Sequence, residues 1–175
     1  MKKIFTITFM FIGVLLLTAC GSENIDVNKT KTDKYNKLSY VVPEKFEKEK
    51  NDYESEIDGS SLVFSDYHYT YKNMASNGKF DDMCSLGFFY DKSSYNDTLE
   101  EYAQIYHEGK TGTKKTINGV EWYIVKEQTS EKMVDYYYYS KYGNNYYEVS
   151  YNDWGKGNIC GDALETIEKS LKFEN

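Results

Sequence analysis

Three cysteines, two histidines and nineteen tyrosines are the side chains of this sequence whose types could carry out chemistry. The sequence contains no arginine, so no guanidinium group can clamp a phosphate or a carboxylate with two parallel hydrogen bonds. His68 follows Asp66 by two residues in a tyrosine-rich, strand-like stretch, so both side chains are expected on one face of a sheet. One imidazole and one carboxylate do not complete a metal site, and we expect a hydrogen-bonded or exposed strand histidine. His107 is predicted to lie solvated on the flank of a helix, beside Glu100 and Glu108.

The motifs that mark catalytic and metal sites are missing from the sequence. Residues 91–97 have part of the spacing of a calcium loop, but Tyr95, Asn96 and Tyr102 occupy positions that require an oxygen ligand, a glycine and a closing glutamate. A weaker, irregular cation site there stays open. The sequence has no zinc-type spacing, no phosphate-binding glycine loop and no Gly-x-Ser-x-Gly elbow. We therefore predict no catalytic residue, no metal and no cofactor.

Cys20 ends the most distinctive segment of the sequence. Two lysines near the N-terminus precede an apolar run of 14 residues, 4–17. This run is short for a membrane span, which needs about 20 residues, and is typical of a secretion signal. The small residues Thr18 and Ala19 follow, directly before Cys20. Small residues suit a protease that needs narrow side chains beside the bond that it cuts.

The segment 17–20 (LTAC) resembles the lipobox of bacterial lipoproteins. The resemblance implies that residues 1–19 are removed and that the Cys20 thiol carries diacylglycerol. Two acyl chains bury roughly 30 methylenes at ~0.8 kcal/mol each, which makes the anchor lasting. We therefore predict a protein held by lipid at the outer face of the cytoplasmic membrane, in a Gram-positive-like envelope. An ordinary secretion signal with an incidental cysteine is the alternative.

The charge of the chain excludes one class of partner. The full sequence has a formal charge of −7. Without residues 1–19 the chain has 19 lysines against 28 acidic residues, a charge of −9. Nucleic acids and anionic lipid headgroups repel such a chain. We expect no nucleic-acid partner, and contact with the membrane through the lipid anchor.

The chain divides into three parts by composition. Residues 1–19 are the predicted signal peptide, and residues 20–36 are the lipidated cysteine and a small, polar, aperiodic tether. Residues 37–175 are predicted to form one globular domain. Aromatic residues make up 17% of the sequence, which supplies enough apolar area for a core of ordinary size.

The patterning within 37–175 predicts strands, a helix, a strand meander and a final helix. The predicted strands are 38–42, 61–71, 83–90, 115–117, 120–125, 133–142 and 146–151. A first helix is expected to be capped by Asp97, and a second to span 158–170. Asn118-Gly119 between two strand-like runs is the favoured signal for a two-residue hairpin. This order predicts an α+β fold in which an antiparallel sheet packs against helices.

Three short segments resemble PsbP-like domains: 38–43 (LSYVVP), 118–123 (NGVEWY) and 170–173 (SLKF). The resemblance covers most of residues 37–173. It implies an αβα sandwich that serves in binding and assembly. The metal and partner sites of the photosynthetic members have no matching residues here, so none is transferred.

Cys84 and Cys160 are the two cysteines within the predicted domain. Cys84 shares a strand face with Leu86 and Phe88, and Cys160 begins the apolar stripe of the last helix, so both thiols should point toward the core. The last helix is therefore expected to cross the strand of Cys84. A disulfide can persist outside the cytoplasm, and it would close a loop of about 77 residues and stabilise the fold by about 4 kcal/mol. Two buried free thiols are the alternative.

The run of four tyrosines at 136–139 is the most unusual feature of the domain. Alternation directs Tyr136 and Tyr138 to one face of the sheet, and Tyr137 and Tyr139 to the other. One interpretation is an aromatic surface, formed by Tyr136, Tyr138 and Tyr146, that stacks on sugar rings or peptide. The other is that these are strand-forming residues supplied by an AT-rich genome.

These observations favour a non-enzymatic binding or adaptor module at the cell surface. The expected partners are cell-wall glycan or another envelope protein. The alternative is a small hydrolase that acts on cell wall or lipid, with a Ser–His–Asp or Cys–His group assembled only by folding.

Overall fold

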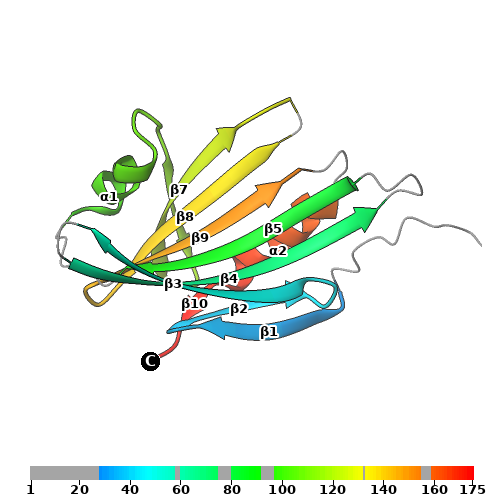
Figure 1. Ribbon diagram of the computed structural model, residues 1–175, viewed down its shortest axis with the longest axis horizontal. Helices are drawn as coiled ribbons and strands as arrows, with labels where there is room; N and C mark the ends of the chain where they lie inside the picture. Colours follow the sequence, from blue (N-terminus) through cyan, green and yellow to red (C-terminus); the bar gives the residue numbers. More distant parts are fainter. Residues whose placement is uncertain (1–27, 58–59, 75–79, 92–96, 132, 155–158) are drawn as a thin grey trace, which may run out of the picture.

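The computed structural model describes residues 28–57, 60–74, 80–91, 97–131, 133–154 and 159–175 (Figure 1). For residues 49–57, 60–74, 80–82 and 159 it describes only the backbone. The predicted signal peptide, Cys20 and the calcium-like segment 92–96 lie outside the described residues. The side chains of Asp66 and His68 also lie outside the description, although both residues belong to a described strand.

A seven-stranded sheet, antiparallel throughout, is the centre of the fold. Its strands lie in the order β3 (Glu47–Ile57), β4 (Ser60–Met74), β5 (Phe80–Asp91), β9 (Asn145–Asp153), β8 (Val134–Tyr142), β7 (Val120–Gln128) and β6 (Thr113–Ile117). A smaller antiparallel sheet has the order β1 (Thr30–Tyr35), β2 (Leu38–Pro43) and β10 (Lys172–Phe173). The two helices are α1 (Leu99–Tyr106) and α2 (Ile159–Ser170). The predicted α+β class with an antiparallel sheet is confirmed.

The small sheet and α2 cover the same face of the large sheet. In Figure 1, α2 runs behind β4 and β5, beside the β1–β2 hairpin. Tyr40 of β2 stacks on Phe88 of β5 with ring centroids 4.2 Å apart, and Ile167 of α2 is buried in the same core. Burial of this apolar area, at roughly 25 cal/mol per Å², is the main force that holds the layers together.

Helix α1 covers part of the opposite face. A capping box starts the helix, because the Thr98 hydroxyl accepts from the backbone N–H of Glu101 while the Glu101 carboxylate accepts from the backbone N–H of Thr98. The cap is therefore Thr98, one residue after the predicted Asp97. Tyr102 of α1 stacks on Tyr146 of β9, with centroids 4.0 Å apart and planes 7° apart. This contact belongs to a second, smaller core on the α1 face.

Three strands were not predicted. Strand β1 lies within residues 20–36, which were assigned to the tether. Its register with β2, from Thr30 opposite Pro43 to Tyr35 opposite Leu38, and the burial of Tyr35 explain why this polar segment is ordered. Strand β3 is rich in lysine and glutamate, and an edge strand tolerates such residues. Strand β10 has only two residues, too few to show alternation.

Candidate functional site

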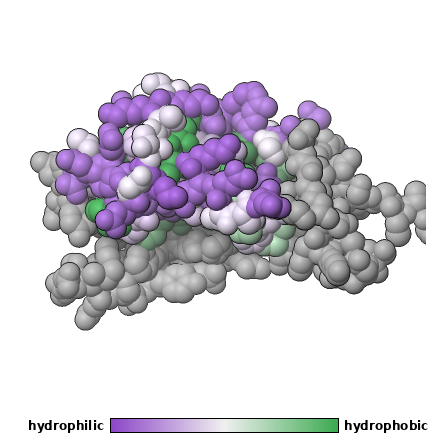
Figure 2. Space-filling model, turned by 90° about the horizontal axis from the view of Figure 1, so that it is seen from above, coloured by the Kyte–Doolittle hydropathy of each residue, from purple (hydrophilic) through white to green (hydrophobic). Residues whose placement is uncertain are grey.

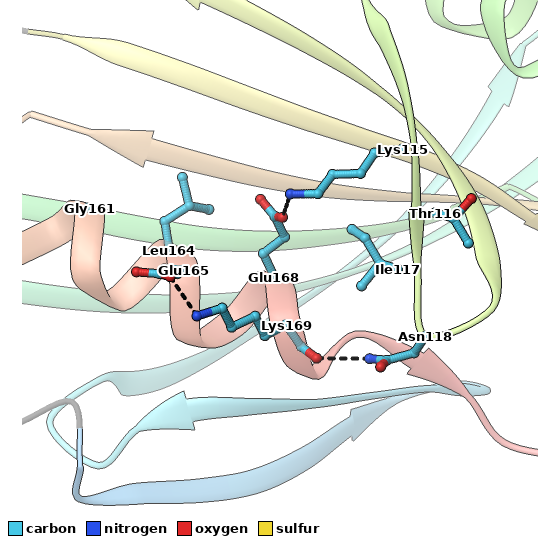
Figure 3. Close-up of a pocket in the computed structure, with 9 residues that line it drawn as sticks. All are labelled: Lys115, Thr116, Ile117, Asn118, Gly161, Leu164, Glu165, Glu168 and Lys169. Carbon is cyan, nitrogen blue, oxygen red and sulfur yellow. Dashed lines mark hydrogen bonds and ion pairs between the residues drawn. The ribbon is translucent and has the colours of Figure 1, made fainter.

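A groove of about 510 Å³ lies between the edge strand β6 and helix α2 (Figure 3). Its lining combines charged, polar and apolar side chains from two segments far apart in the sequence. The lining residues are Lys115, Thr116, Ile117, Asn118, Gly161, Leu164, Glu165, Glu168 and Lys169. Among the coloured residues of Figure 2, hydrophilic ones predominate and hydrophobic ones reach the surface only in small patches. Grooves that combine apolar and polar groups in this way are the usual places for ligands.

The turn between β6 and β7 closes one end of the groove. Asn118 and Gly119 have φ values of 49° and 81°, as the predicted two-residue hairpin requires. The amide of Asn118 also donates to the backbone carbonyls of Lys169, at 2.8 Å, and Leu171, at 3.0 Å. These carbonyls belong to the end of α2, where the helix itself provides no donor. One side chain therefore holds the hairpin against the C-terminal end of α2.

Glu168 is the most constrained charged group of the groove. Its carboxylate accepts a hydrogen bond of 2.9 Å from the Tyr138 hydroxyl and forms an ion pair with Lys115 of β6. Figure 3 shows Lys115 extending across the groove to Glu168. Burial raises the pKa of the Tyr138 phenol above its usual range, and the charge of Glu168 raises it further. Tyr138 therefore stays protonated and donates to Glu168.

The outer rim of the groove is a second pair of charges on α2. Lys169 and Glu165 are one helical turn apart, with 2.5 Å between Nζ and Oε1. The hydrogen bond from Lys169 lowers the pKa of the Glu165 carboxyl. Two lysines and two glutamates thus leave the groove close to neutral, with Ile117 and Leu164 as its apolar part.

Helix α2 is fixed at its N-terminal end by the cysteines. Cys160 in the first turn of α2 and Cys84 in β5 form a disulfide, with Cα atoms 5.8 Å apart and both side chains buried. The helix thus crosses the strand of Cys84, as expected. The Tyr151 hydroxyl also donates to the backbone carbonyl of Cys160 at 2.6 Å. With the Asn118 contacts at its other end, α2 is a rigid wall of the groove.

His107 is not solvated, so that prediction was wrong. It is the C-cap residue of α1 and only 8% exposed, with its ring against Tyr137. Its Nδ1 atom lies 3.1 Å from the Glu127 carboxylate, and its Nε2 atom lies 2.6 Å from the Tyr139 hydroxyl. Burial raises the pKa of the Tyr139 phenol, and the Glu148 carboxylate adds to the rise. The histidine lies inside because α1 crosses β7 and β8 and its C-cap residue faces the sheet.

The proposed aromatic surface of Tyr136, Tyr138 and Tyr146 does not exist as an exposed unit. Tyr138 is 2% exposed in the core below α2, and Tyr146 is fully buried in the core below α1. Tyr136 is partly buried against the α2-side core. Tyr138 and Tyr146 lie on opposite faces of the sheet, and helices cover both faces there. The predicted alternation of the tyrosine run is correct, but neither set forms a platform.

A smaller pocket of about 360 Å³ adjoins the other side of β6. Its lining residues are Asp97, Thr98, Leu99, Lys114, Val120, Glu121 and Lys141. Neither this pocket nor the groove contains a histidine, a cysteine or a serine among its described lining residues.

Within the described part of the chain, no three His, Cys, Asp or Glu side chains come together in a group that could hold a metal ion. No helix within the same residues is long and apolar enough to cross a membrane.

The comparisons with known proteins find matches among solved structures only. No protein-family model matches the chain, and no curated protein matches it. Among solved structures, a crystal structure from Bacteroides thetaiotaomicron VPI-5482 is similar over 84% of this chain and 48% of that chain, with 15% sequence identity and a TM-score of 0.45. The chain thus spans about half the length of the protein it matches.

Proposed function

We propose that this chain is a lipid-anchored binding module at the outer face of the cytoplasmic membrane, and that it is not an enzyme. The groove between β6 and α2 is the observation that carries the proposal. Its polar groups are two ion pairs and an amide that already has partners, and its walls are fixed by a disulfide and by Asn118. Such a groove suits recognition of a partner, because little side-chain order is lost on binding.

The surroundings of His107 argue against general-base catalysis. A neutral imidazole has one donor and one acceptor nitrogen, and here Glu127 and Tyr139 occupy both. A general base needs a nitrogen within reach of a nucleophile that substrate can also approach. His107 is not among the lining residues of the groove or of the smaller pocket.

The anchor rests on the lipobox-like segment ending at Cys20. Nine residues, 21–29, separate Cys20 from the first residue of β1. Nine residues span at most about 30 Å, so the partner of the groove would be an envelope component near the membrane surface.

A PsbP-like relationship is also proposed, on the placement of the three segments that suggested it. Segments 38–43 and 170–173 meet where β2 pairs with β10, with Leu38 opposite Phe173. Segment 118–123 reaches the same place through Trp122, whose ring stacks on Phe173 with centroids 6.0 Å apart. The three short patterns thus form one contiguous part of the fold.

The anchor is tested by mass spectrometry of the full chain expressed in a bacterial host. Protein extracted from membranes should carry an N-terminal diacylglyceryl-cysteine. The Cys20→Ala chain should lose this modification and leave the membrane fraction. A Cys20→Ala chain that stays in the membrane with an unaltered mass would contradict the anchor.

The absence of catalysis is tested by incubating the full chain with peptidoglycan, esters and peptides. No turnover is expected. Turnover that disappears in the His68→Ala or His107→Ala chain would show that the protein is a hydrolase.

A further inference from the structure

The backbone of β6 offers hydrogen-bonding groups that no described residue uses. Strand β6 is the last strand of the large sheet and pairs only with β7. In a two-residue hairpin the pair that flanks the turn is hydrogen-bonded, and such pairs alternate with pairs that are not. Ile117, Lys115 and Thr113 therefore direct their backbone groups toward β7, whereas Lys114 and Thr116 direct theirs outward. An extended polypeptide has the complementary spacing of donors and acceptors.

The side chains of β6 add a charge preference. The strand contains Lys114 and Lys115 and no acidic residue, in a chain whose net charge is negative. Lys115 pairs with Glu168, whereas Lys114 has no ion pair with any described residue. A carboxylate is the favoured cross-strand neighbour of a lysine. The edge therefore suits an acidic segment.

The alternation of β6 defines what such a segment would meet on each face. Side chains on one face would lie over the groove, against Leu164 of α2. Side chains on the other face would lie beside Lys114, at the smaller pocket. Pairing of β6 with β6 of a second copy would place lysines opposite lysines, a known device against edge-to-edge association. A partner segment of different sequence is thus favoured over a second copy.

We propose that β6 binds an acidic, extended polypeptide segment by strand addition, with a carboxylate beside Lys114 and an apolar side chain on Leu164. This inference rests on the proposed binding function and names the class of its ligand. Main-chain hydrogen bonds to Lys114 and Thr116 would supply affinity, and the two faces would supply specificity.

The test uses a matched pair of substitutions at Thr116. Proline is tolerated on an edge strand where its missing N–H faces solvent, so Thr116→Pro should keep the fold and lose one outward donor. Thr116→Val keeps the backbone N–H and the β-branched shape. The probe is an acetylated, amidated heptapeptide in which glutamate alternates with valine, titrated into the full chain in detergent and followed by NMR. A second probe has lysine in place of glutamate.

The acidic peptide is expected to shift the amide signals of Lys114 and Thr116 in the wild-type and Thr116→Val chains. Thr116→Pro should weaken binding by about tenfold, and Lys114→Glu by a few-fold. If Thr116→Pro does not fold, the same acidic peptide with methylated backbone nitrogens replaces it and should lose binding. Equal binding to the Thr116→Pro and Thr116→Val chains, or equal binding of the lysine peptide, would overturn strand addition. Concentration-dependent dimerisation that Thr116→Pro abolishes would identify a second copy as the occupant and would also overturn it.

Failure of strand addition can be distinguished from failure of the binding function. In one outcome the chain binds neither peptide in vitro but forms a covalent adduct in cells through a photoreactive group in the groove. This outcome keeps the binding function and excludes strand addition. In the other outcome the chain binds neither peptide, forms no adduct and shows turnover. This outcome contradicts both strand addition and the binding function.

Discussion

The groove between β6 and α2 and the cluster around His107 both gather polar side chains, and they differ in access. Each combines a tyrosine hydroxyl, a carboxylate and a basic group. At the groove, Tyr138 and Lys115 hold Glu168 at the wall of an open space of about 510 Å³. At the cluster, Tyr139 and Glu127 hold His107, which is only 8% exposed and lies beneath α1.

The comparison shows that residues whose types suggest chemistry are not always residues that a ligand can reach. A histidine with a carboxylate and a hydroxyl has the composition of a catalytic group, yet here it joins α1 to the sheet. The groove has an unremarkable composition of lysine, glutamate and asparagine, yet it has a rigid wall and an open edge. Four changes of condition or sequence sharpen the comparison, from the largest expected effect to the smallest.

High pH should disrupt both regions together, because both depend on buried phenols. Burial, with the nearby charge of Asp135, raises the pKa of Tyr137 to about 12, and burial raises the pKa of Tyr138 and Tyr139 further. A phenol whose pKa is higher in the folded than in the unfolded state contributes its full stability below about pH 10 and loses it as the pH rises. Unfolding is thus expected between about pH 10 and 12. Simultaneous tyrosinate absorbance and circular dichroism should show that ionisation and unfolding coincide. Ionisation of all the tyrosines near pH 10 in a chain that stays folded would contradict the burial.

Loss of the disulfide should weaken the wall of the groove more than any single side chain does. The bridge joins residues 76 apart in sequence, so in the chain-entropy model it stabilises the fold by about 4 kcal/mol. Denaturant unfolding of the full chain with and without reductant measures the change, and the Cys84→Ser, Cys160→Ser double variant is the control. Non-reducing peptide mapping tests the bridge itself. Quantitative alkylation of both cysteines in denaturant without reductant would exclude it.

Removal of the His107 ring should destabilise the α1 face without affecting the groove. His107→Ala removes one hydrogen-bond partner from Glu127 and one from the Tyr139 hydroxyl in a mostly buried place, at a cost of about 1–3 kcal/mol. Denaturant midpoints measure the loss, with the exposed Glu100→Ala as the matched control. A variant as stable as the control would show that the cluster does not support the fold.

Removal of one hydroxyl should have a smaller effect, confined to the groove. Tyr138→Phe keeps the buried ring and deletes the hydrogen bond to Glu168, so the free energy of unfolding should fall by about 1 kcal/mol. Tyr136→Phe, on the same face of β8, is the control. NMR should show the Glu168 signals change in the first variant and stay in place in the second. Unchanged Glu168 signals in Tyr138→Phe would mean that the contact is not formed.

The sequence predicted the elements whose patterns are local. Three predicted features depend on residues that are close in sequence, and the structure contains them. They are the Asn118-Gly119 hairpin, the alternation of the tyrosine run and the apolar stripe of the last helix, which begins at Cys160. The edge strand β3 lacks alternation because it carries lysine and glutamate on many positions. Strand β1 depends on pairing with β2, which polar composition does not reveal.

The site was harder to predict because its contacts join distant parts of the chain. Asn118 was recognised as a turn residue, but its bonds to the end of α2 span about fifty positions. Glu168 shows no signal except a place on the polar side of a helix. His107 was misplaced because the helical pattern alone does not show that α1 ends facing the sheet. The tyrosines were strand-forming residues in two cores, and the sequence does not show that both faces are covered.

A photoreactive benzoylphenylalanine placed at one of two positions in the full chain, expressed in its own cells, tests the central claim most directly. The groove position is Leu164, and the control position is Ile105, which is 55% exposed on α1. We predict that illumination links the chain to a discrete envelope component from position 164 and not from position 105. An adduct from position 105 with none from position 164 would contradict the assignment of the groove as the binding site.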